Sequence, residues 1–140
     1  MKITATSPTV LAQARRIAAE NGLGDDAVEA IIIGAEAKRL QIVGLTIHDW
    51  ACRARADWNW MLQARRQRRL PGTRRQRRAL ISSITSRFIR VDRAYVQAAC
   101  AACDSAVAFD NAAYALHADY WSQGPLREAA DDLERAIARL

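Results

Sequence analysis

The chain has 140 residues, a formal net charge of +6 and a sequence pI near 9.9. This length suits one domain with a core of its own. No apolar run approaches the roughly 18 residues that a membrane span needs. We therefore expect no membrane partner, and the clustered basic charge favours nucleic acid as the partner.

Composition predicts the fold class. Half of the residues are apolar but few are aromatic, and the three prolines and six glycines fall almost entirely between apolar-periodic stretches. Such a composition is typical of an all-α protein. We interpret the chain as a single-domain helical bundle of about five to six helices over residues 1–140, with residues 1–6 as an N-terminal arm.

The first two helices are predicted from their end signals. Ser7, followed by proline, is suited to cap a helix that ends at Asn21-Gly22 in the left-handed manner. A second helix is expected from Asp25 to a stop at Gly44. Gly34 inside it is expected to mark a close helix crossing, since glycine otherwise costs about 1 kcal/mol there.

The third predicted helix carries three tryptophans. Thr46 has capping-box spacing to the acidic residue three positions later, so this helix is expected over Ile47–Arg69. Trp50 and Trp58 keep the spacing of its inner face and are predicted to be core. Trp60 lies off that face and is the better candidate for an exposed ring that faces a partner.

Residues 63–80, QARRQRRLPGTRRQRRAL, hold eight arginines and no acidic residue. Pro71 and Gly72 predict the end of one helix and Thr73 caps the next, so this stretch is an Arg-rich helix-turn-helix junction. A solvated charged turn is the simpler interpretation, but solvated faces usually mix signs. The guanidinium group of arginine can donate two hydrogen bonds to two oxygens of one phosphate, which favours an anionic partner. The candidate nucleic-acid-binding residues are Arg65, Arg66, Arg68, Arg69, Arg74, Arg75, Arg77 and Arg78, followed by Arg87 and Arg90.

A long apolar seam follows the junction, from Leu80 to Tyr120 in steps of three and four. One helix from Thr73 to Ser122 would satisfy it, as would two helices that join near Asp104-Ser105. We favour two helices, because helices much beyond about 25 residues are unusual. After Gln123-Gly124-Pro125, a last helix is expected over Leu126–Leu140, with an apolar inner face and an acidic outer face.

Other chemistry is weakly signalled. One HxxxC pattern and one CxxC pattern together supply four side chains of the kind that bind zinc, but they would have to come together in space to form a site. These four side chains, here called the zinc set, are His48, Cys52, Cys100 and Cys103. Two of them lie in an alanine-rich helical run without a knuckle glycine, so we favour buried free thiols and assign no metal or cofactor. His117 and Asp119 have no accompanying nucleophile, so we expect no enzyme.

The sequence thus predicts a non-catalytic subunit that binds a nucleic-acid backbone, of RNA or single-stranded DNA, without reading its sequence. In size, helical pattern and the basic stretch RRQRRLPGTRRQRR, the chain is similar in outline to the small helical subunits of class 1 CRISPR effector complexes. This resemblance implies no catalysis, guide and target backbones as ligands, and other protein subunits as partners in a ribonucleoprotein. Independently of the resemblance, the acidic last helix and the basic middle of the chain predict head-to-tail pairing between copies of it.

Two alternatives remain open from the sequence. One is a phage or plasmid protein-interaction module whose arginines meet an acidic host partner. The other is a helix-turn-helix DNA-binding regulator with arms on either side of Gly44-Leu45, although its arginines come late on the second arm. Three cysteines, an odd number, and no apolar signal segment in the first ten residues favour a cytoplasmic location.

Overall fold

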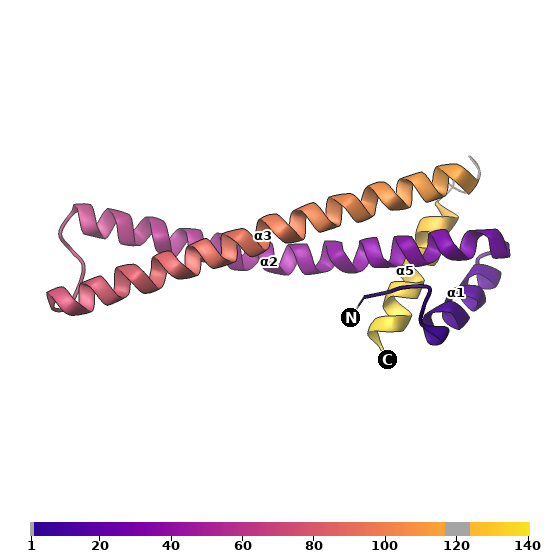
Figure 1. Cartoon of the computed structure of the whole chain (residues 1–140), viewed down its shortest axis with the longest axis horizontal. Helices are drawn as coiled ribbons and strands as arrows, with labels where there is room; N and C mark the ends of the chain where they lie inside the picture. Colours follow the sequence, from indigo (N-terminus) through magenta and orange to yellow (C-terminus); the bar gives the residue numbers. More distant parts are fainter. Residues whose placement is uncertain (1, 117–123) are drawn as a thin grey trace. The chain divides into compact units, whose positions relative to one another are not determined.

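The computed structural model describes residues 2–116 and 124–140. Its elements are α1 (Pro8–Glu20), the short 3-10 helix η1 (Asp25–Ala27), α2 (Val28–Arg66), α3 (Arg74–Leu116) and α5 (Pro125–Ala138) (Figure 1). No strand occurs among the described residues, so the all-α prediction is confirmed. The same residues form four α-helices rather than five or six. His117, Asp119, Tyr120, Ser122 and Gln123 lie outside the described residues.

The helix count was overestimated because two predicted breaks do not exist. Gly44 and Thr46 lie inside α2, and Asp104-Ser105 lies inside α3. Gly44 does not adopt the positive φ of a helix-ending glycine. One interior glycine costs about 1 kcal/mol, whereas a break leaves four backbone groups unpaired on each side and requires a new helix nucleus. The helix-turn-helix with arms around Gly44-Leu45 is therefore wrong.

The chain clusters into two compact units. The first, here called the core unit, is Met1–Ile42 with Cys100–Leu140, and the second, the hairpin unit, is Val43–Ala99. Helices α2 and α3 contribute residues to both. A single domain over residues 1–140 stays a prediction. None of the described helices combines the length and apolar character that a bilayer crossing requires.

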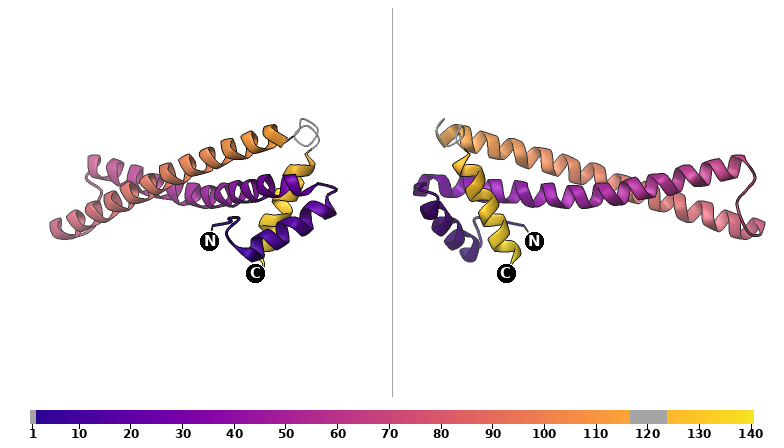
Figure 2. Two further views of the ribbon diagram at one scale, coloured as in Figure 1. Left: turned by 45° about the vertical axis from the view of Figure 1, so that its right-hand side comes forward. Right: turned by 180° about the vertical axis from the view of Figure 1, so that it is seen from behind.

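The core unit is closed by α1, α5 and parts of α2 and α3. Helix α1 packs against α5 (Figure 2), and the fully buried side chains include Ile17, Ile31, Leu126 and Leu133. The predicted inner face of α5 is confirmed, except that Leu140 is exposed. Gly34 is also confirmed as a close crossing, because a Cβ there would lie 2.7 Å from the Cβ of Ala130.

The ends of α1 follow their sequence signals. The Ser7 side chain accepts a hydrogen bond from the Val10 N–H at 3.4 Å. At the other end Gly22 has φ 71°, and the Leu23 N–H donates to the Ala18 carbonyl at 2.8 Å. These are the bonds of a Schellman cap, and Leu23 is buried beside it. Local chemistry thus sets both ends of this helix.

The N-terminal arm is tied to α2 through a buried carboxylate. The Ile3 N–H donates to Glu36 Oε2 at 2.7 Å, and Arg39 contacts the same carboxylate at 2.9 and 2.5 Å. Burial raises the pKa of Glu36, but the bonds from Arg39 and Ile3 and the charges of Arg39 and Lys2 outweigh it. The pKa of Glu36 therefore lies below its ordinary value.

The hairpin unit consists of two antiparallel helical segments joined by the arginine-rich turn (Figure 1). Met61, Ala64 and Leu70 form its buried core, and Trp58 stacks on Phe88 with ring centroids 4.7 Å apart. Cross-helix ion pairs flank this core, namely Arg55–Asp92 at 3.8 Å and Arg87–Asp57 at 3.3 Å.

The tryptophans divide in a way that the sequence only partly predicted. Trp58 packs against the hairpin core as expected. Trp60 is exposed, also as expected, but Trp50 is exposed too, which corrects its assignment to the core. Two helices alone can cover only a narrow seam, so a residue at the margin of an apolar stripe is left in solvent.

Candidate nucleic-acid interface

The C-terminal end of α2 forms the first half of the arginine-rich turn. The helix ends at Arg66, somewhat before the predicted Arg69. The Arg69 N–H donates to the Ala64 carbonyl at 2.8 Å and the Arg68 N–H to that of Arg65 at 3.2 Å. This is again a Schellman cap, but its left-handed position is occupied by Arg68, with φ 55°, instead of glycine.

The second half of the turn is fixed by a reciprocal capping box. The Thr73 hydroxyl accepts from the Gln76 N–H at 3.2 Å, and the Thr73 N–H donates to Gln76 Oε1 at 2.8 Å. Gly72 has φ 90°, and a Cβ there would lie 2.5 Å from that same Oε1. Thr73 is thus confirmed as the cap of α3, and glycine is required before it.

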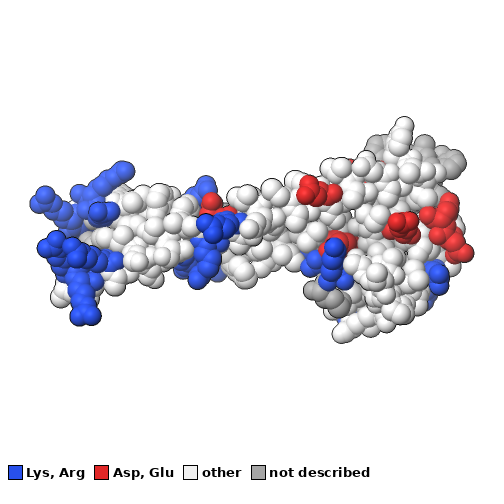
Figure 3. All heavy atoms as spheres, in the orientation of Figure 1, with Lys and Arg blue, Asp and Glu red and all other residues white. Residues whose placement is uncertain are grey.

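The eight arginines from Arg65 to Arg78, here called the arginine tip, have no carboxylate partners among the described residues. In the part of the chain that the structure describes, none of them forms an ion pair. Arg69 donates to the Gln67 side chain at 3.0 Å and Arg77 to the Gly72 carbonyl at 2.6 Å. Seven of the eight are exposed and Arg77 is half-buried. Basic side chains gather around this turn, with no acidic group among them in the view of Figure 3.

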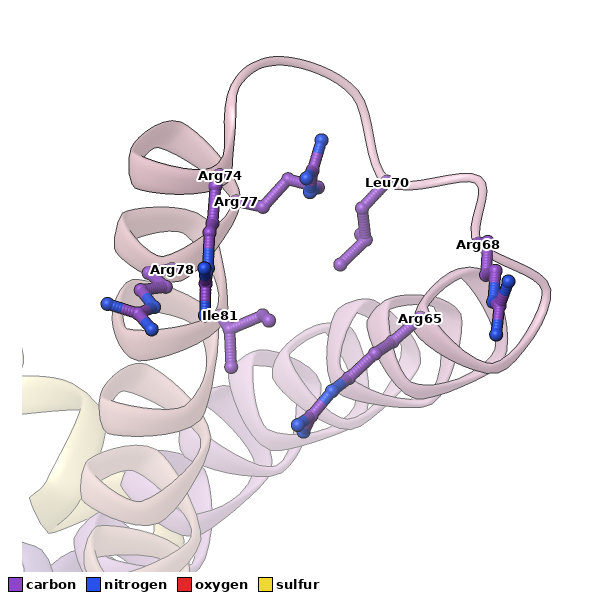
Figure 4. Close-up of a pocket in the computed structure, with 7 residues that line it drawn as sticks. All are labelled: Arg65, Arg68, Leu70, Arg74, Arg77, Arg78 and Ile81. Atoms are coloured by element: carbon purple, nitrogen blue, oxygen red, sulfur yellow. The ribbon is translucent and has the colours of Figure 1, made fainter.

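Five members of the arginine tip surround a cleft of about 550 Å³. Arg65 comes from the last turn of α2, Arg68 from the turn itself, and the others from the start of α3 (Figure 4). The apolar side chains of Leu70 and Ile81 line the same space. The cleft therefore has both cationic and apolar side chains in its lining. Its lining arginines are Arg65, Arg68, Arg74, Arg77 and Arg78.

The two helix ends place these charges in opposite electrostatic settings. Arg65 and Arg66 lie in the last turn of α2, where the macrodipole favours cations. Arg74 and Arg75 open α3, where it disfavours them, and the first turn of α3 carries no acidic residue. An anion bound near the start of α3 would meet both guanidinium groups and free N–H groups.

The two remaining candidates, Arg87 and Arg90, lie on α3 outside the arginine tip. Arg87 is engaged by Asp57, so it is not freely available to a ligand. Arg90 is exposed and lines a shallow groove on α3 with Arg93. The acidic residue nearest to them in the sequence, Asp92, pairs with Arg55 across the hairpin.

The zinc set is not assembled. Among the described residues, no group of three or more His, Cys, Asp or Glu side chains is placed to hold a metal ion. His48 and Cys52 are neighbours on α2, with Nε2 and Sγ 3.7 Å apart. All three thiols are exposed, which corrects the prediction of buried thiols. Cys100 and Cys103 lie beside the apolar seam of α3 rather than on it.

Sequence reasoning missed a second, smaller cavity on the hairpin unit, of about 190 Å³. Trp60, Gln63 and Ala64 line it from α2, together with Gln67 and Arg69 from the turn that follows. The signal that could have revealed it is the spacing i, i+3, i+4 and i+7, which puts residues on one helix face.

No family model matches this chain, and neither a curated protein nor a solved structure is significantly similar to it.

Proposed function

We propose that this protein binds nucleic-acid backbones through the arginine tip, without catalysis and without reading base sequence. The observation that carries this proposal is the unpaired state of the tip. Eight guanidinium groups are held around one turn, and no carboxylate of the described chain neutralises any of them. A polyanion is the ligand class that such a group of cations recognises best.

The number of like charges gathered at one turn favours a polyanion, because a single guanidinium fork binds two oxygens of a carboxylate as readily as two of a phosphate. A nucleic-acid strand presents one phosphate charge per nucleotide, so it can engage several of these forks together. Affinity would come mainly from release of condensed counterions. With six to eight phosphate contacts, it should fall on the order of 10³-fold or more between about 50 and 200 mM salt.

The proposal includes a place in a larger ribonucleoprotein, such as the class 1 CRISPR effectors whose small helical subunits the chain resembles in outline. Purification of the tagged full chain from its native host, followed by sequencing of bound RNA and identification of bound proteins, tests this part. Recovery of the protein alone would contradict it, even if the purified protein binds nucleic acid.

The binding experiment uses fluorescence anisotropy with unrelated RNA and DNA oligonucleotides, single-stranded and duplex, at rising salt. The test variant replaces Arg65, Arg74 and Arg78 by alanine. The charge-matched control replaces three arginines of the core unit that are exposed and form no ion pair with any described residue, namely Arg15, Arg127 and Arg139.

We expect the test variant to weaken binding to every oligonucleotide and to flatten the salt slope by about 2 to 3. The control should change neither. Equal loss in both variants would show that net charge, and not the tip, carries the binding. Binding to poly-glutamate without binding to any oligonucleotide would refute the proposal and support an acidic protein partner.

A further inference from the structure

The cavity of about 190 Å³ beside the arginine tip has the chemistry of a site for one flat, polar-edged ring. It is smaller than the roughly 300–1,000 Å³ of pockets that take a drug-sized ligand. Ala64, which is buried and ends at Cβ, leaves the space between Trp60 on α2 and Gln67 just beyond its end. The cavity therefore presents an aromatic wall, a small floor and a polar far side.

The aromatic wall is not needed for packing. Trp60 is 51% exposed, and the ring pairs among the described residues, His48–Tyr95 and Trp58–Phe88, do not include it. Trp58 already supplies the ring that closes the hairpin core. A half-exposed indole next to a basic cluster is an open stacking surface.

The polar side offers both donors and acceptors. Gln67 Oε1 accepts a hydrogen bond from Arg69 Nη1 at 3.0 Å, which fixes the amide and leaves its NH₂ group to donate. The Gln63 amide forms no side-chain hydrogen bond within the described chain, so its oxygen and NH₂ group are both available. Nucleobase edges carry donors and acceptors side by side, which is the pattern that carboxamides match.

We infer that this cavity holds an unpaired nucleobase, stacked on Trp60 with its edge against Gln63 and Gln67. Arg69 and the arginine tip would hold the adjoining phosphates. This inference rests on the proposed function and narrows its ligand to single-stranded nucleic acid. In a duplex each base is already stacked and paired, so its face is closed to an indole.

The test compares two single strands of equal length, one with bases and one with an abasic sugar-phosphate backbone, in low salt. Trp60→Ala is the test variant. Trp50→Ala is a matched control, because Trp50 lies on the same helix, is 53% exposed and lines none of the cavities near the tip. Trp60→Phe keeps a stacking ring, and Gln63→Ala with Gln67→Ala removes only the edge contacts.

We expect Trp60→Ala to bind the base-bearing strand about 5- to 150-fold more weakly, the equivalent of losing 1–3 kcal/mol of base stacking. Its affinity for the abasic strand should not change. The double glutamine variant should also weaken only the base-bearing strand, and Trp60→Phe should retain most of the affinity. Circular dichroism of each variant establishes that the helices are intact.

Two results would overturn the inference. One is that Trp60→Ala and Trp50→Ala bind the base-bearing strand with equal affinity. The other is that Trp60→Ala loses the same amount of affinity for the base-bearing strand and for the abasic strand. In either result the proposed function survives, provided that the wild type binds both strands and the triple arginine variant binds neither well. A wild type that binds neither strand refutes the proposed function and the base site together.

Discussion

Replacing each of two glycines inside α2 by alanine should change the free energy of unfolding in opposite directions. Gly34 and Gly44 are both helical, and neither has a positive φ. Replacing an interior helical glycine by alanine gains about 1 kcal/mol from helix propensity. At Gly44 a new Cβ would meet nothing within 4 Å. Gly44→Ala should therefore raise the free energy of unfolding by about 1 kcal/mol.

At Gly34 the same methyl group collides with the core. It would lie 2.6 Å from Phe109 Cε2 and 2.7 Å from the Cβ of Ala130. Phe109 is buried, and the Ala130 Cβ is attached directly to the backbone of α5, so no change of rotamer relieves the second clash. Overpacking of this kind costs roughly 1–3 kcal/mol. After the propensity gain, Gly34→Ala should lower the free energy of unfolding by up to about 2 kcal/mol.

Urea denaturation followed by far-UV circular dichroism measures both changes. Ala130→Gly should cost less stability in the Gly34→Ala variant than in the wild type, because in the variant it also removes the rigid contact. If Gly34→Ala stabilises the protein as much as Gly44→Ala does, the close crossing of α2 with α3 and α5 is wrong.

Three further predictions concern single side chains. Because folding lowers the pKa of Glu36, its carboxylate stabilises the fold above its ordinary pKa of 4.5, and this stabilisation is lost as the pH falls through the lowered value. Glu36→Gln should therefore cost about 1–3 kcal/mol at neutral pH and less at pH values below the folded pKa, as denaturation at several pH values would show. Arg68→Gly should raise the free energy of unfolding by about 1 kcal/mol, because glycine adopts the left-handed backbone conformation of this position without strain. The same variant should bind RNA more weakly in the anisotropy assay. Thr73→Ala should lower stability by about 0.5–2 kcal/mol through loss of the capping box with Gln76; an unchanged thermal midpoint would contradict that cap.

The sequence was informative where structure is decided locally. Ser7, Asn21-Gly22 and Thr73 were predicted as helix ends, because the groups that satisfy the terminal backbone lie within a few residues. The inner face of α5 was also predicted, since one 3.6-residue stripe holds all its large apolar side chains. Gly34 was recognised because an interior glycine usually has a packing reason.

Features that depend on distant parts of the chain were predicted poorly. Gly44 and Asp104-Ser105 looked like breaks, but a break is decided by what the flanking turns pack against, which local composition does not contain. Trp50 has the spacing of a core residue and is nevertheless exposed. The cleft of the arginine tip was foreseen as a cluster of charges, whereas its apolar lining by Leu70 and Ile81 depends on the path of the turn.

The division of the chain into units has a consequence for the order of folding. The hairpin unit is one uninterrupted segment, Val43–Ala99, whereas the core unit joins Met1–Ile42 to Cys100–Leu140. Contacts of the core unit must therefore close a long loop, at an entropic cost that is smaller once the intervening segment is ordered. We expect the hairpin unit to form first, although it has the smaller apolar cluster. A destabilising substitution of Met61 should then slow refolding, whereas one of Leu133 should mainly speed unfolding.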